Sequence, residues 1–298
     1  MMRYEQLIIT EPAANFRALA RRGIRDRWGD AFLKGWLYVL VLSLPYVIIL
    51  AMAGWLGFPG DNMNKLTDAY TDFLLGSTSQ AQFMNSMDAM YNNLLMLPYL
   101  YQLLVTGALT FGITTVYLRY RRRQEAPTEL LLSGFSHYSR SLALFLLMTI
   151  FTMLWTMLFI IPGIIAAYRY RLAFCILVDN PDIGPLEAIN VSKGLMRGNK
   201  WKLFCLDISF IGWALLAVLA CSIMTSVLVT PFVSGIVTGE TPSYNMGMGV
   251  LFAIVTSLVT AVSMGLFYMY QGTASAAFYE RASGLLKYTD ERPVGTSL

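Results

Sequence analysis

The sequence predicts an all-α protein, a polytopic membrane helical bundle with six transmembrane helices. Three observations indicate this fold class: 56% of the 298 residues are hydrophobic, only 13% are charged, and long apolar stretches recur along the chain. Ordinary soluble domains carry about 25% charged residues. The composition therefore excludes a water-soluble globular enzyme, and the many aromatic residues exclude a disordered chain.

Six apolar stretches give the six predicted spans, because about 20 apolar residues suffice to cross a bilayer as a helix. They are 36–56, 94–118, 141–161, 163–178, 203 to about 231, and 249 to about 279. The third and fourth are almost continuous, and one straight helix over both would exceed a hydrocarbon core of about 30 Å. Pro162 and Gly163 lie at their junction and favour a break, so we expect a hairpin there.

The positions of the cations predict the topology, since cytoplasmic loops of membrane proteins are rich in Lys and Arg. With six spans and both termini cytoplasmic, the 22 Lys and Arg residues all face the cytoplasm except Lys65, Arg169 and Arg171. Lys65 is then outside, and the two arginines are in the membrane. A five-span arrangement would place the last two basic groups outside. The charge distribution therefore favours six spans.

The six spans form a predicted membrane domain over residues 36–279. Three segments other than spans lie one before this domain, one within it and one after it. Residues 1–35 alternate apolar and basic positions at helical spacing, which predicts a basic amphipathic helix on the cytoplasmic leaflet. Two roles are open for it: orienting the protein, or binding anionic lipids or a partner. Residues 57–93 predict two short helices that form an outer cap, and residues 280–298 form a cytoplasmic tail.

The centre of the chain carries a recognisable pattern. It consists of Ile160-Ile161-Pro162-Gly163, Asp179-Asn180-Pro181, Glu187-Ala188-Ile189 and Ser209-Phe210-Ile211-Gly212-Trp213. This pattern resembles an uncharacterised bacterial family of integral membrane proteins, domain of unknown function nine-seven-five. More distantly, it is similar to the membrane domain attached to some glycerophosphodiester phosphodiesterases. The resemblance implies a multi-pass protein of the bacterial cytoplasmic membrane with no established activity.

The residues needed for catalysis are scarce. The single histidine, His137, lies in a predicted inner loop, where it supplies neither a zinc site nor a Ser–His dyad. Cys175, Cys205 and Cys221 lie in or beside apolar stretches, as inert cysteines do. The sequence has no phosphate-binding GxxxxGK[ST] motif. We therefore expect no catalytic residue, no metal, no cofactor and no nucleic-acid partner.

Two cations in the fourth span are the strongest candidates for a ligand site. A charged side chain near mid-bilayer costs about 2.5–3.5 kcal/mol, so Arg169 and Arg171 should each find a partner or water. They cannot share one helix face. One alternative is contact with an anion or a lipid phosphate, and the other is a structural pair with Asp207. The predicted ligand site comprises Arg169, Arg171, Asp207, Tyr168, Tyr268 and Gln271.

Two functions follow as hypotheses. In the first, the protein is non-enzymatic and binds or translocates a small amphipathic or anionic, lipid-like ligand. In the second, it is an accessory or scaffold subunit that packs against another membrane protein or a second copy. Gly265 and Gly272 in the last span favour close helix packing in either case.

Overall fold

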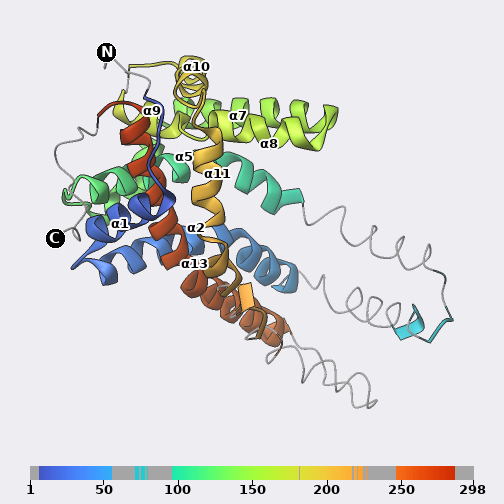
Figure 1. Ribbon diagram of the computed structural model, residues 1–298. Helices are drawn as coiled ribbons and strands as arrows, with labels where there is room; N and C mark the ends of the chain where they lie inside the picture. Colours follow the sequence, from blue (N-terminus) through green and yellow to red (C-terminus); the bar gives the residue numbers. More distant parts are fainter. Residues whose placement is uncertain are drawn as a thin grey trace. The chain divides into compact units, whose positions relative to one another are not determined.

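The computed structural model describes residues 7–55, 71–73, 75–77, 79, 96–180, 182–216, 218–219, 221–223, 226 and 246–285. Every regular element among these residues is a helix (Figure 1), which confirms the all-α prediction. The helices are α1 Ala13–Ile24, α2 Trp28–Trp55, α5 Met96–Arg121, η1 Thr128–Leu132, α6 Ser133–Ser136, α7 Tyr138–Leu158, α8 Ile160–Tyr170, α9 Ala173–Asp179, α10 Pro185–Leu195, α11 Lys200–Ile208 and α13 Met246–Ala282. Of these, η1 is a 3₁₀-helix.

Four helical stretches within the described residues are long and apolar enough to cross a membrane. They are Tyr99–Arg121, Tyr138–Leu158, Ile160–Asp179 and Lys200–Ile223. These stretches coincide with the second to fifth predicted spans, while the first and last predicted spans fall within α2 and α13. The apolar side chains of the second half of α7, from Met153 to Leu158, are exposed, as expected for a helix that faces lipid.

The chain divides into two compact units. Unit 1 comprises residues 1–38, 105–215 and 265–298, and unit 2 comprises residues 39–104 and 216–264. Within unit 2, the Tyr101 hydroxyl donates a hydrogen bond to the Val41 carbonyl at 3.0 Å, which joins α5 to α2. The predicted outer cap falls in this unit. Apart from positions 71–73, which are helical, and the turn at Gly76, most of it lies outside the described residues.

The break between α7 and α8 lies at Phe159, three residues before Pro162. Phe159 has extended backbone angles (φ −159°, ψ 150°), and α8 begins at Ile160. Pro162 is therefore in the first turn of α8, where a helix has no acceptor for the missing N–H. α7 and α8 run side by side (Figure 1). Their contact is close, because a Cβ atom on Gly163 would lie 2.2 Å from Thr156 Oγ1.

Helix α1 buries its apolar face in the protein. Phe16 and Ile24 are 1% and 0% exposed, and the Phe16 ring lies 5.3 Å from that of Phe278 in α13. Sequence analysis predicted the amphipathic helix correctly but assigned its apolar face to the lipid leaflet. The structure corrects this assignment, because that face packs against α11 and α13.

Residues 7–10, here called the N-terminal strap, fix distant parts of unit 1 to one another. The Ile9 amide donates to Asn199 Oδ1 at 2.9 Å, and Asn199 Nδ2 donates to the Leu7 carbonyl at 2.8 Å. The Leu7 amide donates to the carbonyl of Ala282 at the end of α13. Asn199 is fully buried, so its amide group satisfies backbone groups that water does not reach.

Candidate functional site

Four of the six predicted site residues lie together around Asp207 of α11. The Tyr168 hydroxyl donates to Asp207 Oδ2, and Gln271 Nε2 donates to Oδ1, both at 3.0 Å. The guanidinium of Arg171 lies 3.9 Å from Oδ1. The cluster joins three helices, because Tyr168 lies in α8, Asp207 in α11 and Gln271 in α13. Here this group of four is called the Asp207 cluster.

The other two predicted residues lie apart from this cluster. The carbonyl of Arg169 accepts a hydrogen bond from Ser192 Oγ at 2.8 Å, whereas its guanidinium has no partner among the described residues. Tyr268 packs its ring edge-on against Tyr38 at 5.9 Å and is 40% exposed. Arg169 and Arg171 therefore point in different directions, as their helical spacing requires.

The Asp207 cluster leaves positive charge in a candidate membrane span. Among the described residues, Asp207 is the carboxylate that pairs with Arg171, and its oxygens already accept from Tyr168 and Gln271. The Arg171–Asp207 separation is at the outer limit for an ion pair, and the Arg171 side chain is 47% exposed. The Ile160–Asp179 stretch thus carries two guanidinium groups, of which only that of Arg171 lies near Asp207.

A second polar group lies where three helices end, and sequence analysis missed it. Arg122 follows α5 and donates to Asp179 of α9 at 2.7 and 2.9 Å and to Glu280 of α13 at 2.8 Å. Arg121 lies 3.3 Å from Glu280, and Tyr279 donates to Asp179 at 3.0 Å. The two carboxylates are 3% and 7% exposed. Here these residues are called the Arg122 network.

The contacts of the Arg122 network stabilise the charged form of Arg122. Burial lowers the pKa of the Arg122 guanidinium, but the hydrogen bonds to Asp179 and Glu280 outweigh this and raise the pKa above its ordinary value. Such a closed set of charges stabilises the junction of α5, α9 and α13 and presents no free group to a ligand. A signal existed in the sequence, since Asp179, Glu280 and the arginine run each follow the end of an apolar stretch.

A third polar group fixes the start of α2. Lys34 is 1% exposed and forms an ion pair with Asp30, while its Nζ donates to the Tyr120 hydroxyl at 3.1 Å. Tyr120 also donates to Asp30. Burial acts to raise the pKa of Asp30, but the hydrogen bonds from Lys34 and Tyr120 prevail and lower it. Asp30 therefore stays ionised and neutralises the buried ammonium group.

His137 and the three cysteines are the residues that were considered for catalysis. The His137 ring stacks on Phe111 at 5.5 Å, and its Nδ1 lies 3.0 Å from Ser136 Oγ. The three cysteines are free thiols. Across the described part of the chain, no group of three or more His, Cys, Asp or Glu side chains could hold a metal ion. The predicted absence of cofactors stays a prediction.

Comparison with known proteins finds a family model that matches part of the chain. Residues 157–285 match the model of the family described as "Protein of unknown function (DUF975)". This match confirms the resemblance inferred from the central pattern. No curated protein and no solved structure matches the chain. The more distant similarity to the membrane domain of glycerophosphodiester phosphodiesterases has no support in these comparisons.

Proposed function

We propose that this protein, which matches the DUF975 family model over residues 157–285, is a non-enzymatic integral membrane protein that binds an anionic, lipid-like ligand. The ligand site centres on the Asp207 cluster, and Arg169, which lies apart from the cluster, adds a second cation from the same stretch. Translocation of the ligand is a further step of the same proposal. The support comes from one observation, the excess of positive charge in the Ile160–Asp179 stretch.

An anionic ligand would lower the free-energy cost of placing Arg169 and Arg171 in the membrane. An arginine within the hydrocarbon region is stabilised by a counter-charge or by water, and Asp207 can neutralise only one of the two. A guanidinium group also binds phosphate and carboxylate through paired hydrogen bonds, which an ammonium group cannot do as well. A phospholipid headgroup combines such an anion with the apolar chains that a membrane protein meets.

Lipid retention tests this proposal. We expect the purified wild-type protein to retain phosphatidylglycerol in preference to phosphatidylcholine. In the variant Arg169→Gln with Arg171→Gln, the affinity for phosphatidylglycerol should fall about tenfold, equivalent to about 1.4 kcal/mol. Native mass spectrometry of protein titrated with each lipid measures both affinities. Lys200→Gln removes one cation outside the cluster and serves as the control.

Equal retention of the two lipids by the wild type would contradict the proposal. The same holds if the double variant keeps the wild-type affinity. Arg169→Gln alone provides a second measurement, since Arg169 has no side-chain partner among the described residues and its replacement leaves the Asp207 cluster intact.

The proposal includes a topology of six spans in a bacterial cytoplasmic membrane, with both termini cytoplasmic. It takes α2 and α13 as the first and last crossings and places the hairpin of the third and fourth at Phe159 to Gly163. The main support is the charge distribution, because cations follow the ends of the second and fourth spans and precede the first.

Cysteine labelling tests the topology. In a chain whose three native cysteines are replaced, Gly194→Cys should react with an impermeant maleimide only after the membrane is opened. Gly194 is exposed, and a Cβ there has no atom within 4 Å, so the new thiol fits. Ser79→Cys is the opposite control and should react in intact cells. Labelling of Gly194→Cys from outside would exclude the hairpin.

An accessory role is the alternative function, and one observation is compatible with it. α7 and α8 expose a large apolar surface that includes Met157 (75%), Ile160 (72%) and Ile161 (71%). Such a surface fits lipid or the helices of another membrane protein equally well. Purification in a mild detergent followed by identification of co-purifying proteins separates the two, and a partner recovered only with intact α7 and α8 would favour the accessory role.

A further inference from the structure

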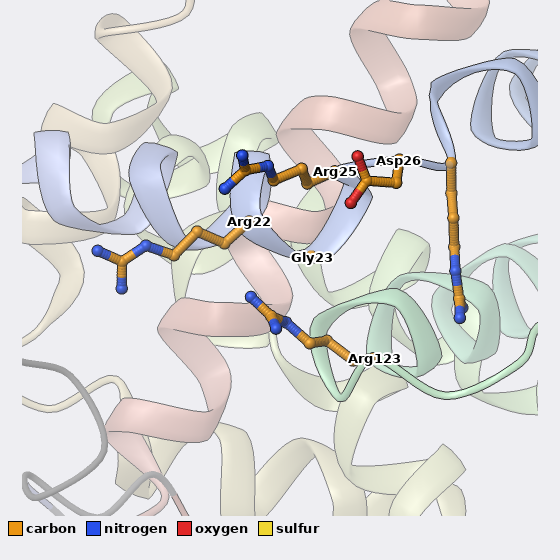
Figure 2. A pocket seen from close by; sticks show the side chains of 6 residues that line it. Arg22, Gly23, Arg25, Asp26 and Arg123 are labelled. Carbon is orange, nitrogen blue, oxygen red and sulfur yellow. The ribbon is translucent and has the colours of Figure 1, made fainter. Parts of the chain in front are cut away.

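A pocket in unit 1 collects arginine side chains from two places in the sequence. It is lined by Arg22, Gly23, Arg25, Asp26, Arg27 and Arg123 and has a volume of about 390 Å³. Figure 2 shows Arg22 and Arg25 on the α1 side and Arg123 on the facing side, with Gly23 between them. Here it is called the arginine pocket. It is separate from the Asp207 cluster and shares no residue with it.

Contacts between α1 and the end of α5 hold the two walls of the pocket in place. Gly23 lies directly on the end of α5, because a Cβ atom there would be 2.8 Å from the Tyr120 carbonyl oxygen. Ile24, the next residue, is fully buried. Arg27 donates to the Gln124 carbonyl at 2.8 Å and so ties the turn after α1 to the loop after α5. These contacts fix the two sides of the pocket against each other.

Both sides of the pocket contain a non-glycine residue with a positive φ. Asp26 has a φ of +67° and Arg123 a φ of +53°. This region is unfavourable for residues with a Cβ atom, and such residues persist where the surrounding structure or a function requires them. Arg123 directs its side chain towards the α1 side of the pocket (Figure 2).

The cations of the pocket lack counter-charges. Among the residues that the structure describes, the side chains of Arg22, Arg25 and Arg123 have no hydrogen-bond or ion-pair partner, and Asp26 is the only carboxylate lining the pocket. The neighbouring Arg122, in contrast, is neutralised by Asp179 and Glu280. The ends of α1 and α5 contribute partial negative charge of about half a unit each, too little to balance four guanidinium groups.

We propose that the arginine pocket binds a phosphate-bearing anion. Several guanidinium groups around one cavity are the arrangement that recognises phosphate, since each can donate two parallel hydrogen bonds to its oxygens. The volume of about 390 Å³ leaves room for the group to which a phosphate is attached. Inorganic phosphate and the headgroup of an acidic phospholipid share this chemistry, and the experiment separates them.

Calorimetric titration of the full-length protein in neutral detergent tests the proposal. The three probes are inorganic phosphate, a short-chain phosphatidic acid, and acetate at the same ionic strength. We expect saturable binding of at least one phosphate probe and none of acetate. The dissociation constant should rise about tenfold in Arg25→Gln and in Arg123→Gly. Glycine removes the cation and also accepts the positive φ at this position, so the fold is preserved.

Two controls locate the binding. Lys200→Gln loses one positive charge elsewhere, and Arg169→Gln changes the site of the proposed function; both should keep the wild-type affinity for the phosphate probe. Binding of phosphatidic acid alone would identify a lipid headgroup, and binding of both probes a soluble phosphate compound. The proposal is overturned if neither phosphate probe binds saturably, if acetate binds equally well, or if Arg25→Gln and Arg123→Gly bind like the wild type.

Discussion

Replacement of Arg122 with methionine should destabilise the protein by about 3–5 kcal/mol, the loss expected when one partner of a buried ion pair is removed. The carboxylates of Asp179 and Glu280 are 3% and 7% exposed and would remain close together without Arg122 between them. Arg121 keeps its own contact with Glu280, at 3.3 Å. Unfolding of the protein in detergent, followed by circular dichroism against denaturant, measures the loss.

Two comparisons separate this charge effect from a general effect of losing an arginine. Arg25→Met makes the same substitution at an exposed position with no carboxylate partner and should change the stability by less than about 1 kcal/mol. In a protein that already carries Asp179→Asn and Glu280→Gln, the cost of Arg122→Met should fall by at least half. If Arg122→Met costs the same in both backgrounds, the network does not act through its charges.

The second large effect is expected where α2 and α13 meet within unit 1. A Cβ atom on Gly35 would lie 2.2 Å from the carbonyl oxygen of Gly265, which is backbone and cannot rotate away. Gly35→Ala should therefore force the two helices apart and cost about 1–3 kcal/mol, even though alanine is the better helix former. The decrease in the midpoint temperature of thermal unfolding, relative to the wild type, measures this loss of stability.

Gly194→Ala is the matched control for this substitution. Gly194 lies in α10, and a Cβ there has no atom within 4 Å. The same exchange should leave the stability unchanged or raise it by up to about 1 kcal/mol. A Gly35→Ala protein as stable as Gly194→Ala would show that α2 and α13 are not in contact at these glycines.

The long helices could be predicted from the sequence because each coincides with a long apolar stretch, and α1 because its apolar and basic residues recur at helical spacing. The Asp207 cluster could also be anticipated in part: polar residues are rare in the spans, so those present had few possible partners. Tyr168, Arg171 and Gln271 do lie around Asp207, whereas Tyr268 packs on Tyr38. The difference depends on how each helix is rotated about its own axis, which apolar stretches alone do not determine.

Other features depend on tertiary contacts and could not be predicted. The break lies at the extended residue Phe159, and α8 begins at Ile160, two residues before Pro162, although proline was the visible signal for the break. The apolar face of α1 has the residue pattern of a helix that faces lipid. The sequence therefore did not show that this face packs against other helices of the protein. The arginine pocket requires positive φ angles at Asp26 and Arg123, which these residue types rarely adopt.

The N-terminal strap has a consequence for the order of assembly during synthesis. Ile9 binds Asn199, which is 190 positions later in the chain, and Leu7 binds the carbonyl of Ala282 at the end of the last helix. A ribosome makes the strap before α11 and α13, yet its binding site is complete only when α13 has been made. The strap therefore docks after the helices have been inserted, and a nascent chain that stops before residue 282 leaves it without its full set of partners.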